Sequence, residues 1–318
     1  MVTLEKVKIL KSILGDYYKS SDEHLFHCPF CKHHKNKLSV NVEKNVWKCW
    51  VCDASGKKVF QLVKKFGDYE HIREWLKYDK TTELTKTDVE LANLFNKDAK
   101  GPAPTISLPN DFVSLCNPNK SESSYRPLNY LKSRDISDDL IKKWRVGYCQ
   151  HGIYEKRIII PSFNLNGDIN FFVSRTFTGD KFKYKNPKVK RTEIIFNELY
   201  IDWNKPIYLV EGVFDAMKFK SNSIPLLGST LSKRHRLFKK IVENNCKVYI
   251  GLDQDANKKQ NKIINLLSKY GIECYVINTA GFEDIAEMPD TDLTSRIINS
   301  SKTSDLDCIL DKLRYLNI

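Results

Sequence analysis

The sequence lacks the long apolar runs that membrane insertion requires. None of its 318 residues lies in a stretch approaching the roughly 18 consecutive apolar residues that span a bilayer. The first residues, MVTLEKVKILKSIL, are amphipathic and lack the apolar core of a signal peptide. We therefore expect no membrane partner and a cytoplasmic location.

Acidic charge is the minority charge, and repeats and low-complexity tracts are absent. Lys and Arg number 52 against 39 Asp and Glu, which gives a formal net charge of +13. With 41% apolar residues the chain can bury a core, so it is not a disordered basic tail. The excess of basic residues indicates a polyanionic partner, most often nucleic acid. A basic surface that has no such partner remains the alternative interpretation.

Two close cysteine pairs indicate a metal site. They form Cys-x2-Cys, seventeen residues, Cys-x2-Cys, and consist of Cys28, Cys31, Cys49 and Cys52. This spacing is typical of a zinc ribbon, whereas a redox-active pair would explain only one of the two motifs. Four protein ligands leave no open position, so one Zn²⁺ would be structural. The other five of the nine cysteines are scattered, as reduced intracellular thiols usually are.

The segment between the pairs is basic and β-prone, with aromatic residues at its ends. Its histidines and lysines could contact phosphates, and its aromatic side chains could stack on bases. We interpret Trp47 and Trp50 as partly structural and the run around His33 and His34 as the face toward nucleic acid. Whether these histidines bind DNA is left open.

Apolar runs that alternate with helical patterns mark an α/β layer in the C-terminal half. The runs are PIYLV, IPLLG, KVYIGL and IECYVI, and between the last three lie SKRHRLFKKIVENN and ANKKQNKIINLLSKYG. Such alternation predicts a parallel sheet flanked by helices.

Acidic residues follow three of these predicted strands. They are Glu211, Asp215, Asp253, Asp255 and Asp284. Because the carboxyl ends of parallel strands meet at one edge of a sheet, we expect a Mg²⁺ or Mn²⁺ site built mainly from Glu211, Asp253 and Asp255. On a strictly extended strand Asp253 and Asp255 would face the same side. The structural alternative for a single carboxylate is a helix N-cap, and Asp215 is its best example.

The central segment, residues 157–187, predicts a hairpin-rich sheet. Turn signals lie at Asn166-Gly167 and at residues 178–180. Basic residues that lie on or beside its strand ends are expected to bind phosphates, although isolated charges there are more often solvated. They are Arg157, Arg175, Lys181, Lys183 and Lys185.

These motifs together resemble a known family. EGVFDAM, IPLLGSTLS, GLDQDAN and EDIAEM, in this order, are similar to the TOPRIM fold. PLNYLKSRDISDDLIKKWRVGYC and the basic segment after it resemble the RNA polymerase domain of bacterial-type primases. The resemblance implies nucleotide and template binding by Arg157, Arg175, Lys183, Tyr184 and Asn186, to which we add Lys181.

The resemblance implies the fold class and the activity. We expect an α/β TOPRIM parallel sheet with flanking helices, an α+β basic subdomain and a small N-terminal β zinc ribbon. The activity would be synthesis of RNA primers from ribonucleoside triphosphates on single-stranded DNA, together with a replicative hexameric helicase in trans. The alternatives are a TOPRIM nuclease and a non-catalytic zinc-ribbon mediator that binds single-stranded DNA.

Departures from the family pattern refine this expectation. The all-cysteine zinc set and the short tail resemble stand-alone phage primases, which act in the host cytoplasm. No GxxxxGK[ST] motif is present, so we expect no fused helicase. DQDANKK replaces the usual DGD or DxDxAG form. The sequence therefore does not determine how a third carboxylate would be placed around the metal.

Composition and motifs also divide the chain. We expect a zinc-ribbon domain, a flexible linker, a basic subdomain, a TOPRIM catalytic subdomain and a C-terminal helical segment. These occupy residues 1–78, 79–107, 108–200, 201–290 and 291–318.

Overall fold

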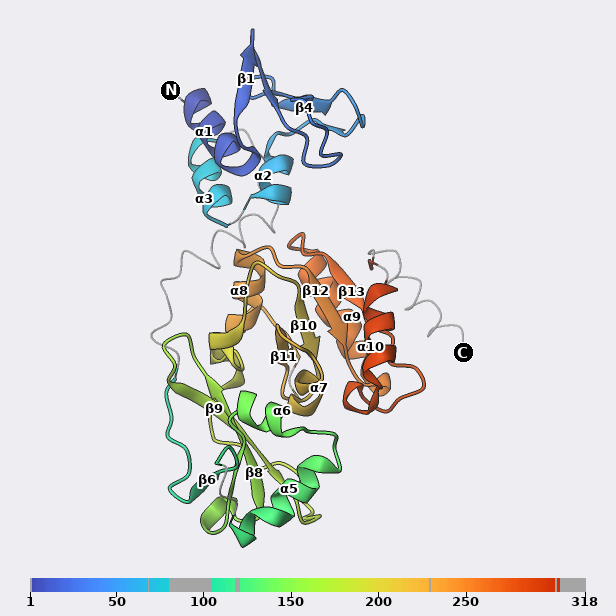
Figure 1. Ribbon diagram of the computed structural model, residues 1–318. Helices are drawn as coiled ribbons and strands as arrows, with labels where there is room; N and C mark the ends of the chain where they lie inside the picture. Colours follow the sequence, from blue (N-terminus) through green and yellow to red (C-terminus); the bar gives the residue numbers. More distant parts are fainter. Residues whose placement is uncertain are drawn as a thin grey trace. The chain divides into compact units, whose positions relative to one another are not determined.

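The computed structural model of the protein describes residues 2–67, 69–79, 104–117, 121–228, 230–300 and 302–303. These residues fall into two compact units, the first formed by residues 2–79, with residues 242–245 grouped with it, and the second by the other described residues from 104 onward (Figure 1). Most of the predicted linker and residues 304–318 lie outside the described part. Among the described residues, no helix combines the length and the apolar character needed to cross a bilayer.

The first unit is a five-stranded antiparallel sheet with three helices. Its strands lie side by side in chain order, so each neighbouring pair is joined by a turn or a short loop. The elements are α1 (Val2–Leu14), β1 (Tyr17–Ser20), β2 (Glu23–Phe26), β3 (Leu38–Asn41), β4 (Val46–Cys49), β5 (Ser55–Gly56), α2 (Phe60–Phe66) and α3 (Tyr69–Tyr78).

The core of this unit lies between the helices and one face of the sheet. Leu10 of α1, Leu62 of α2 and Trp75 of α3 are fully buried and pack in one cluster with Phe26 and Leu38 of the sheet. The Trp75 indole Nε1 donates a hydrogen bond of 2.9 Å to Asp79, which satisfies the one polar atom of this large side chain.

The second unit begins with an antiparallel sheet and two helices that lie between its first and second strands in the chain. Strands β6, β7, β8 and β9 lie in that order, and β8 and β9 form the predicted hairpin around Asn166-Gly167. The elements are β6 (Phe112–Ser114), α5 (Tyr125–Lys132), α6 (Asp138–Lys143), β7 (Gly147–Cys149), β8 (Arg157–Phe163) and β9 (Ile169–Thr176), with 3₁₀ turns η1 (Glu122–Ser124), η2 (Gly152–Tyr154), η3 (Arg191–Glu193) and η4 (Glu198–Tyr200).

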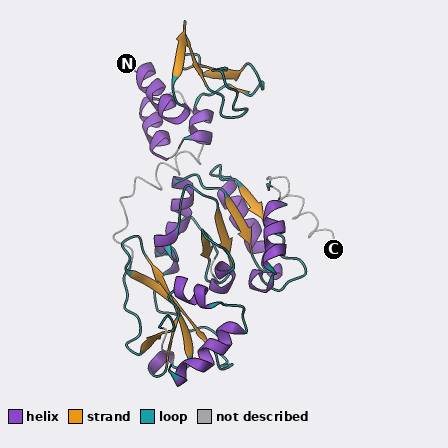
Figure 2. Cartoon of the chain, viewed as in Figure 1, coloured by secondary structure: helices purple, strands orange, loops and turns teal. Residues whose placement is uncertain are grey.

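The same unit continues into a parallel sheet with the strand order β11-β10-β12-β13. Figure 2 shows its strands among the helices that connect them. The elements are β10 (Ile207–Val210), α7 (Val213–Met217), β11 (Ser223–Pro225), α8 (Arg236–Glu243), β12 (Val248–Gly251), η5 (Gln254–Ala256), α9 (Asn257–Ser268), β13 (Cys274–Val276), η6 (Ile285–Glu287) and α10 (Asp290–Ile298). All four predicted strands are present, and the predicted fold class is confirmed.

Helices cover both faces of the parallel sheet. Phe238 of α8 packs edge-on against Tyr270, just beyond α9, with ring centroids 5.1 Å apart, so these two helices share one face. On the other face, α7 and α10 join the buried cluster that also contains the antiparallel sheet. The two sheets therefore share one continuous core, which fixes the basic segment relative to the acidic strand ends.

Candidate catalytic centre and zinc site

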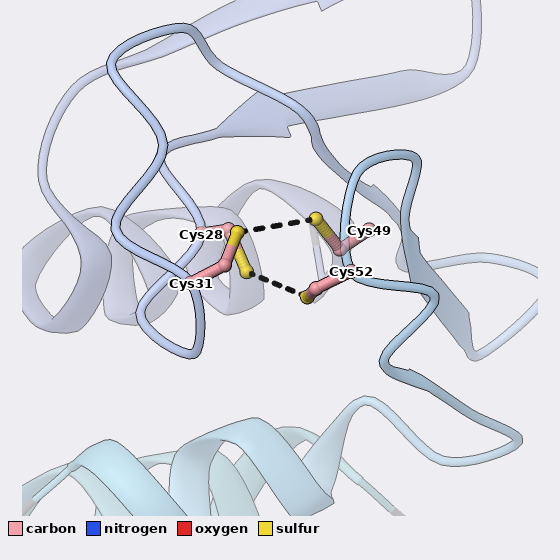
Figure 3. A group of neighbouring side chains, drawn as sticks. All are labelled: Cys28, Cys31, Cys49 and Cys52. Carbon is pink, nitrogen blue, oxygen red and sulfur yellow. Dashed lines mark hydrogen bonds between the residues drawn. The ribbon is translucent and has the colours of Figure 1, made fainter.

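The four cysteines of the predicted zinc ribbon converge in the first unit (Figure 3). Their Sγ atoms all lie within 4.8 Å of one another, with 3.8 Å between Cys28 and Cys52 and 3.9 Å between Cys31 and Cys49. A tetrahedron of thiolates with Zn–S bonds of about 2.3 Å has edges of about 3.8 Å, so the set fits Zn²⁺. The prediction of a four-cysteine zinc site is confirmed, and no ligand position is left for a substrate.

Neighbouring histidines do not belong to this tetrahedron. Among the described residues, the four cysteines are the only group of three or more potential ligands gathered within 4.8 Å. The rings of His33 and His34 lie tilted against each other with centroids 4.3 Å apart, and Lys35 donates its backbone N–H to His33 Nδ1. Trp47 is buried and stacks on Phe30 at 5.4 Å.

Trp50 differs from Trp47. It is 66% exposed, and Lys48 Nζ lies 4.9 Å from its ring centroid. The interpretation of both tryptophans as partly structural is therefore wrong for Trp50. Strand β4 ends at Cys49, and the turn that follows carries Trp50 out of the core.

The acidic residues of the second unit lie at the carboxyl edge of the parallel sheet. Val210 at the end of β10 pairs with Gly251 at the end of β12, so the segments that carry Glu211 and Asp253 leave the sheet side by side. Asp284 follows β13 by eight residues and starts η6. A Cβ at Gly251 would lie 2.3 Å from Ile285 Cδ1, so any larger residue at this position would require the Ile285 side chain to shift.

Asp215 ties two of these segments together. It is the third residue of α7, and its Oδ2 accepts the Gly212 N–H at 2.8 Å while its Oδ1 accepts the Ala286 N–H at 3.1 Å. Burial, followed by repulsion from Asp284 and Asp253, raises the pKa of Asp215 to about 7. The suggested role of helix N-cap is wrong for Asp215, because Gly212 is the N-cap of α7 and Asp215 is the third residue of that helix. The role holds for Asp284, whose side chain accepts the Glu287 N–H.

The charges of the acidic residues act on one another. Burial, followed by Glu211, Asp284 and Asp255, raises the pKa of Asp253 to about 6. The expectation that Asp253 and Asp255 share one side of an extended strand is wrong. Strand β12 ends at Gly251, and Asp255 lies in the 3₁₀ turn η5, because the chain bends there to enter α9.

The loop that carries Asp284 is anchored by the residue between the two aspartates. Gln254 Nε2 donates to the carbonyl oxygens of Thr279 and Phe282 at 3.2 Å and 3.0 Å. Arg296 of α10 also contacts this loop: it donates to Ala280 O at 2.8 Å, and its guanidinium lies over the ring of Phe282. Gln254 occupies the place of the usual glycine in DGD, and its contact with this loop could not be predicted from the sequence, because the two segments meet only in the folded chain.

The sequence also contained no sign of a role for Lys259, although this residue lies in DQDANKK, the segment that departs from the family pattern. It stands in the first turn of α9, and its Nζ is 2.7 Å from Glu211 Oε1. The side chains are 20% and 27% exposed, respectively. The second oxygen, Glu211 Oε2, is buried and has no hydrogen-bond partner among the residues that the structure describes.

An arginine–aromatic cluster joins the basic sheet to α7. Arg175 of β9 donates to the hydroxyls of Tyr130 and Tyr184 and stacks on Phe214 at 5.2 Å. Arg134 donates to the same Tyr130 hydroxyl and lies 5.3 Å from the centre of the Phe214 ring. Phe214 is three residues beyond Glu211, so this cluster borders the acidic edge. Tyr130 and Arg134 belong to the quoted YLKSR motif, which could have identified them.

The remaining predicted basic residues take different positions. Arg157 is 4% exposed, and its guanidinium donates to Asp180 at 2.9 Å and to the Phe182 carbonyl. Asn186 accepts the Ser174 N–H, which holds its segment along β9. The lysines of this segment are exposed, namely Lys181, Lys183 and Lys185.

Comparison with known proteins shows what the chain is similar to. The family model of the CHC2 zinc finger matches residues 3–91. The DNA primase of Mycoplasma genitalium is 21% identical over 80% of this chain and 51% of its own length. The DNA primase of Mycoplasma pneumoniae is 24% identical over 82% of this chain and 52% of its own length. The chain thus spans about half the length of the curated relatives it matches.

The second unit has the fold of a primase catalytic domain. A solved DnaG primase catalytic domain bound to single-stranded DNA superposes with a TM-score of 0.52 and 14% identity over 61% of this chain and 77% of that one. The first unit is thus similar to the CHC2 zinc finger, and the second has a fold found in a primase catalytic domain. In sequence the chain is similar to DNA primases, and its second unit shares the fold of a DnaG primase catalytic domain, in agreement with the resemblance that the motifs indicated.

Proposed function

We propose that this chain is a DNA primase, which joins ribonucleotides into short primers on single-stranded DNA. The observation that carries the proposal is the meeting of the acidic edge with the arginine–aromatic cluster across Phe214. Carboxylates there can hold metal ions, and cations beside them can hold phosphates, which are the two requirements of nucleotidyl transfer. Related DNA primases and a DnaG domain bound to single-stranded DNA support the same reaction and template.

The acidic edge fits divalent metal chemically. Glu211, Asp253 and Asp255 would hold Mg²⁺ or Mn²⁺, with Asp215 and Asp284 supporting them. Within the described part of the chain the buried Glu211 Oε2 has no hydrogen-bond partner, and burial together with repulsion from its acidic neighbours raises the pKa of Asp253, so a bound cation would relieve both costs. When bound, the metal would neutralise charge on the triphosphate and lower the pKa of the attacking hydroxyl.

The protein's own residues position the reactants. Arg175 and Tyr184, next to the acidic edge, orient the nucleotide phosphates, and the exposed lysines of residues 181–185 bind the template backbone. Arg157 and Asn186 hold the segment that carries these groups, and their direct contact with nucleic acid stays a prediction. The zinc finger binds template DNA, with Trp50 available for base stacking.

Primer synthesis tests the proposal directly. Asp253→Asn is expected to lower the yield of oligoribonucleotides from single-stranded DNA, Mg²⁺ and ribonucleotides at least about a hundredfold, because it removes a charge that holds metal in the transition state. The exposed Asp138→Asn on α6 is the matched control and should retain synthesis. Full synthesis by Asp253→Asn would refute the assignment.

Two other outcomes identify the alternatives. Mg²⁺-dependent degradation of DNA without use of ribonucleotides would indicate a TOPRIM nuclease. The non-catalytic zinc-ribbon mediator would show no primer synthesis. Its binding of single-stranded DNA would be affected neither by removal of metal nor by Glu211→Gln. Adding a hexameric helicase to the same assay tests the proposed partner in trans.

The predictions about cellular location, domain divisions and layout follow from the proposed reaction. A priming enzyme acts where DNA is replicated, in the cytoplasm of a bacterium or of a phage's host. We retain the domain divisions at residues 78, 107, 200 and 290 as part of the proposal, and the phage-like layout stays a prediction.

A further inference from the structure

Lys259 occupies a position that the helix itself disfavours. The first turn of α9 contains Lys258 and Lys259 and no acidic residue. The N-terminus of a helix carries partial positive charge, so a cation there is destabilising unless a nearby anion compensates it. Lys258 is exposed to solvent, whereas Lys259 is largely covered and reaches Glu211.

The contact links the two strand ends that form the acidic edge. Glu211 follows β10, and Lys259 follows β12 and the turn η5 that contains Asp255. The 2.7 Å distance makes this a charge-assisted hydrogen bond, with both side chains mostly withdrawn from water. The charge of Lys259 also opposes the repulsion that Asp253 experiences from its acidic neighbours.

Lys259 therefore occupies the same carboxylate that a divalent metal would use. A carboxylate oxygen that accepts from an ammonium at 2.7 Å cannot at the same time take a metal ion from that direction. A metal held by the other oxygen would stand close to a positive charge in a partly covered site, where repulsion between cations is strong.

We propose that Lys259 is an internal counter-ion for Glu211, which divalent metal must displace and which thereby lowers the metal affinity of the acidic edge. The proposal rests on the metal site of the proposed function. Lys259 acts through Glu211 as a positioning residue, and it keeps the edge compact while metal is absent. Metal loading would then release its ammonium group from Glu211.

Metal binding to the full zinc-loaded chain tests this role without any measurement of activity. The electron paramagnetic resonance signal of free Mn²⁺ gives the dissociation constant. Lys259→Met removes the charge but keeps most of the side-chain length, and it should tighten Mn²⁺ binding about tenfold, a factor that corresponds to about 1.4 kcal/mol. Lys259→Arg keeps the charge and should bind like the wild type.

Two controls separate local competition from a general change in charge. Lys258→Met removes a charge from the same helical turn at an exposed position and should leave the Mn²⁺ affinity within about twofold of wild type, because solvent screens exposed charges. In a Glu211→Gln background, Lys259→Met should no longer tighten binding.

The outcomes also separate this inference from the proposed function. Unchanged or weaker Mn²⁺ binding by Lys259→Met, while the wild type binds and Asp253→Asn does not, overturns the counter-ion role alone. Absence of Mn²⁺ binding by the wild type overturns both. As a folding control, Lys259→Met should unfold at a lower temperature than wild type without Mn²⁺ and recover more stability when Mn²⁺ is added.

Discussion

Asp215 is the most buried of the five acidic side chains, and both of its oxygens accept backbone hydrogen bonds. Its contacts join the start of α7 to η6, so it fixes the spacing between the segments that carry Glu211 and Asp284. A carboxylate with two N–H donors would ordinarily have a low pKa. Here burial and its acidic neighbours outweigh those donors, and the pKa rises to about 7.

This raised pKa predicts how stability depends on pH. The folded state holds the Asp215 proton more tightly than the unfolded state, in which the pKa is near 3.8. The contribution of Asp215 to the free energy of unfolding is therefore greatest below pH 4. It is lost as the pH rises toward about 7, by on the order of 1 kcal/mol per pH unit. Asp253, whose pKa is about 6, acts in the same direction.

Amide exchange in β10 and β12 measures this effect in the second unit. Without divalent metal other than the structural zinc, the free energy of opening should fall between pH 5 and pH 7 in the wild type. Asp215→Asn should make that fall shallower, whereas Asp138→Asn on the exposed face of α6 should not. An equal fall in wild type and Asp215→Asn would contradict the raised pKa.

The segment of residues 278–284 has no regular secondary structure, yet it positions an acidic residue. Three anchors hold it: Gln254 from η5, Arg296 from α10, and the Thr279 hydroxyl, which donates to Leu252 O at 3.1 Å. Side-chain bonds to backbone carbonyls replace the strand pairing that ends at Val276. The position of Asp284 thus depends on the elements on either side of the loop.

Gln254→Ala should loosen this loop without unfolding the sheet. Hydrogen exchange of residues 278–284 should become faster by about thirtyfold, since two hydrogen bonds worth about 1 kcal/mol each are lost. Arg296→Met, which removes the anchor from α10, should have a similar effect. Unchanged exchange in both variants would show that the loop holds its shape by itself.

The two units have separate hydrophobic cores, and they depend on different interactions. The core of the first unit contains Cys28 and Cys49, so zinc and apolar packing stabilise the same small volume. The core of the second unit extends over both of its sheets and contains no predicted zinc ligand. Small domains often need a metal because they bury too little apolar surface.

Removal of zinc should therefore unfold the first unit and spare the second. Structural zinc contributes about 10 kcal/mol or more to the folding of small domains at neutral pH. After chelation, limited proteolysis should cleave within residues 2–79 while residues 121–300 remain protected. Cys31→Ser should have the same effect and the exposed His34→Ala should not; simultaneous loss of protection in both units would contradict the separation.

Local patterns were sufficient for much of this fold. Cys-x2-Cys pairs, Asn166-Gly167 and the four apolar runs act through short-range geometry, so the zinc site, the β8–β9 hairpin and the parallel strands could be predicted from the sequence. The edge at which Glu211 and Asp253 meet followed as well, because parallel strands place their carboxyl ends together.

Only the tertiary structure decided which side chains the acidic and basic groups meet. Lys259 and Glu211 lie 48 positions apart in the sequence, and Arg175 lies 45 positions from Tyr130, so no local pattern pairs them. Burial of Arg157 and exposure of Trp50 depend on how whole elements pack. The physical reason is that strand and turn geometry is a local property, whereas contacts, burial and shifted pKa values depend on segments that only the folded chain brings together.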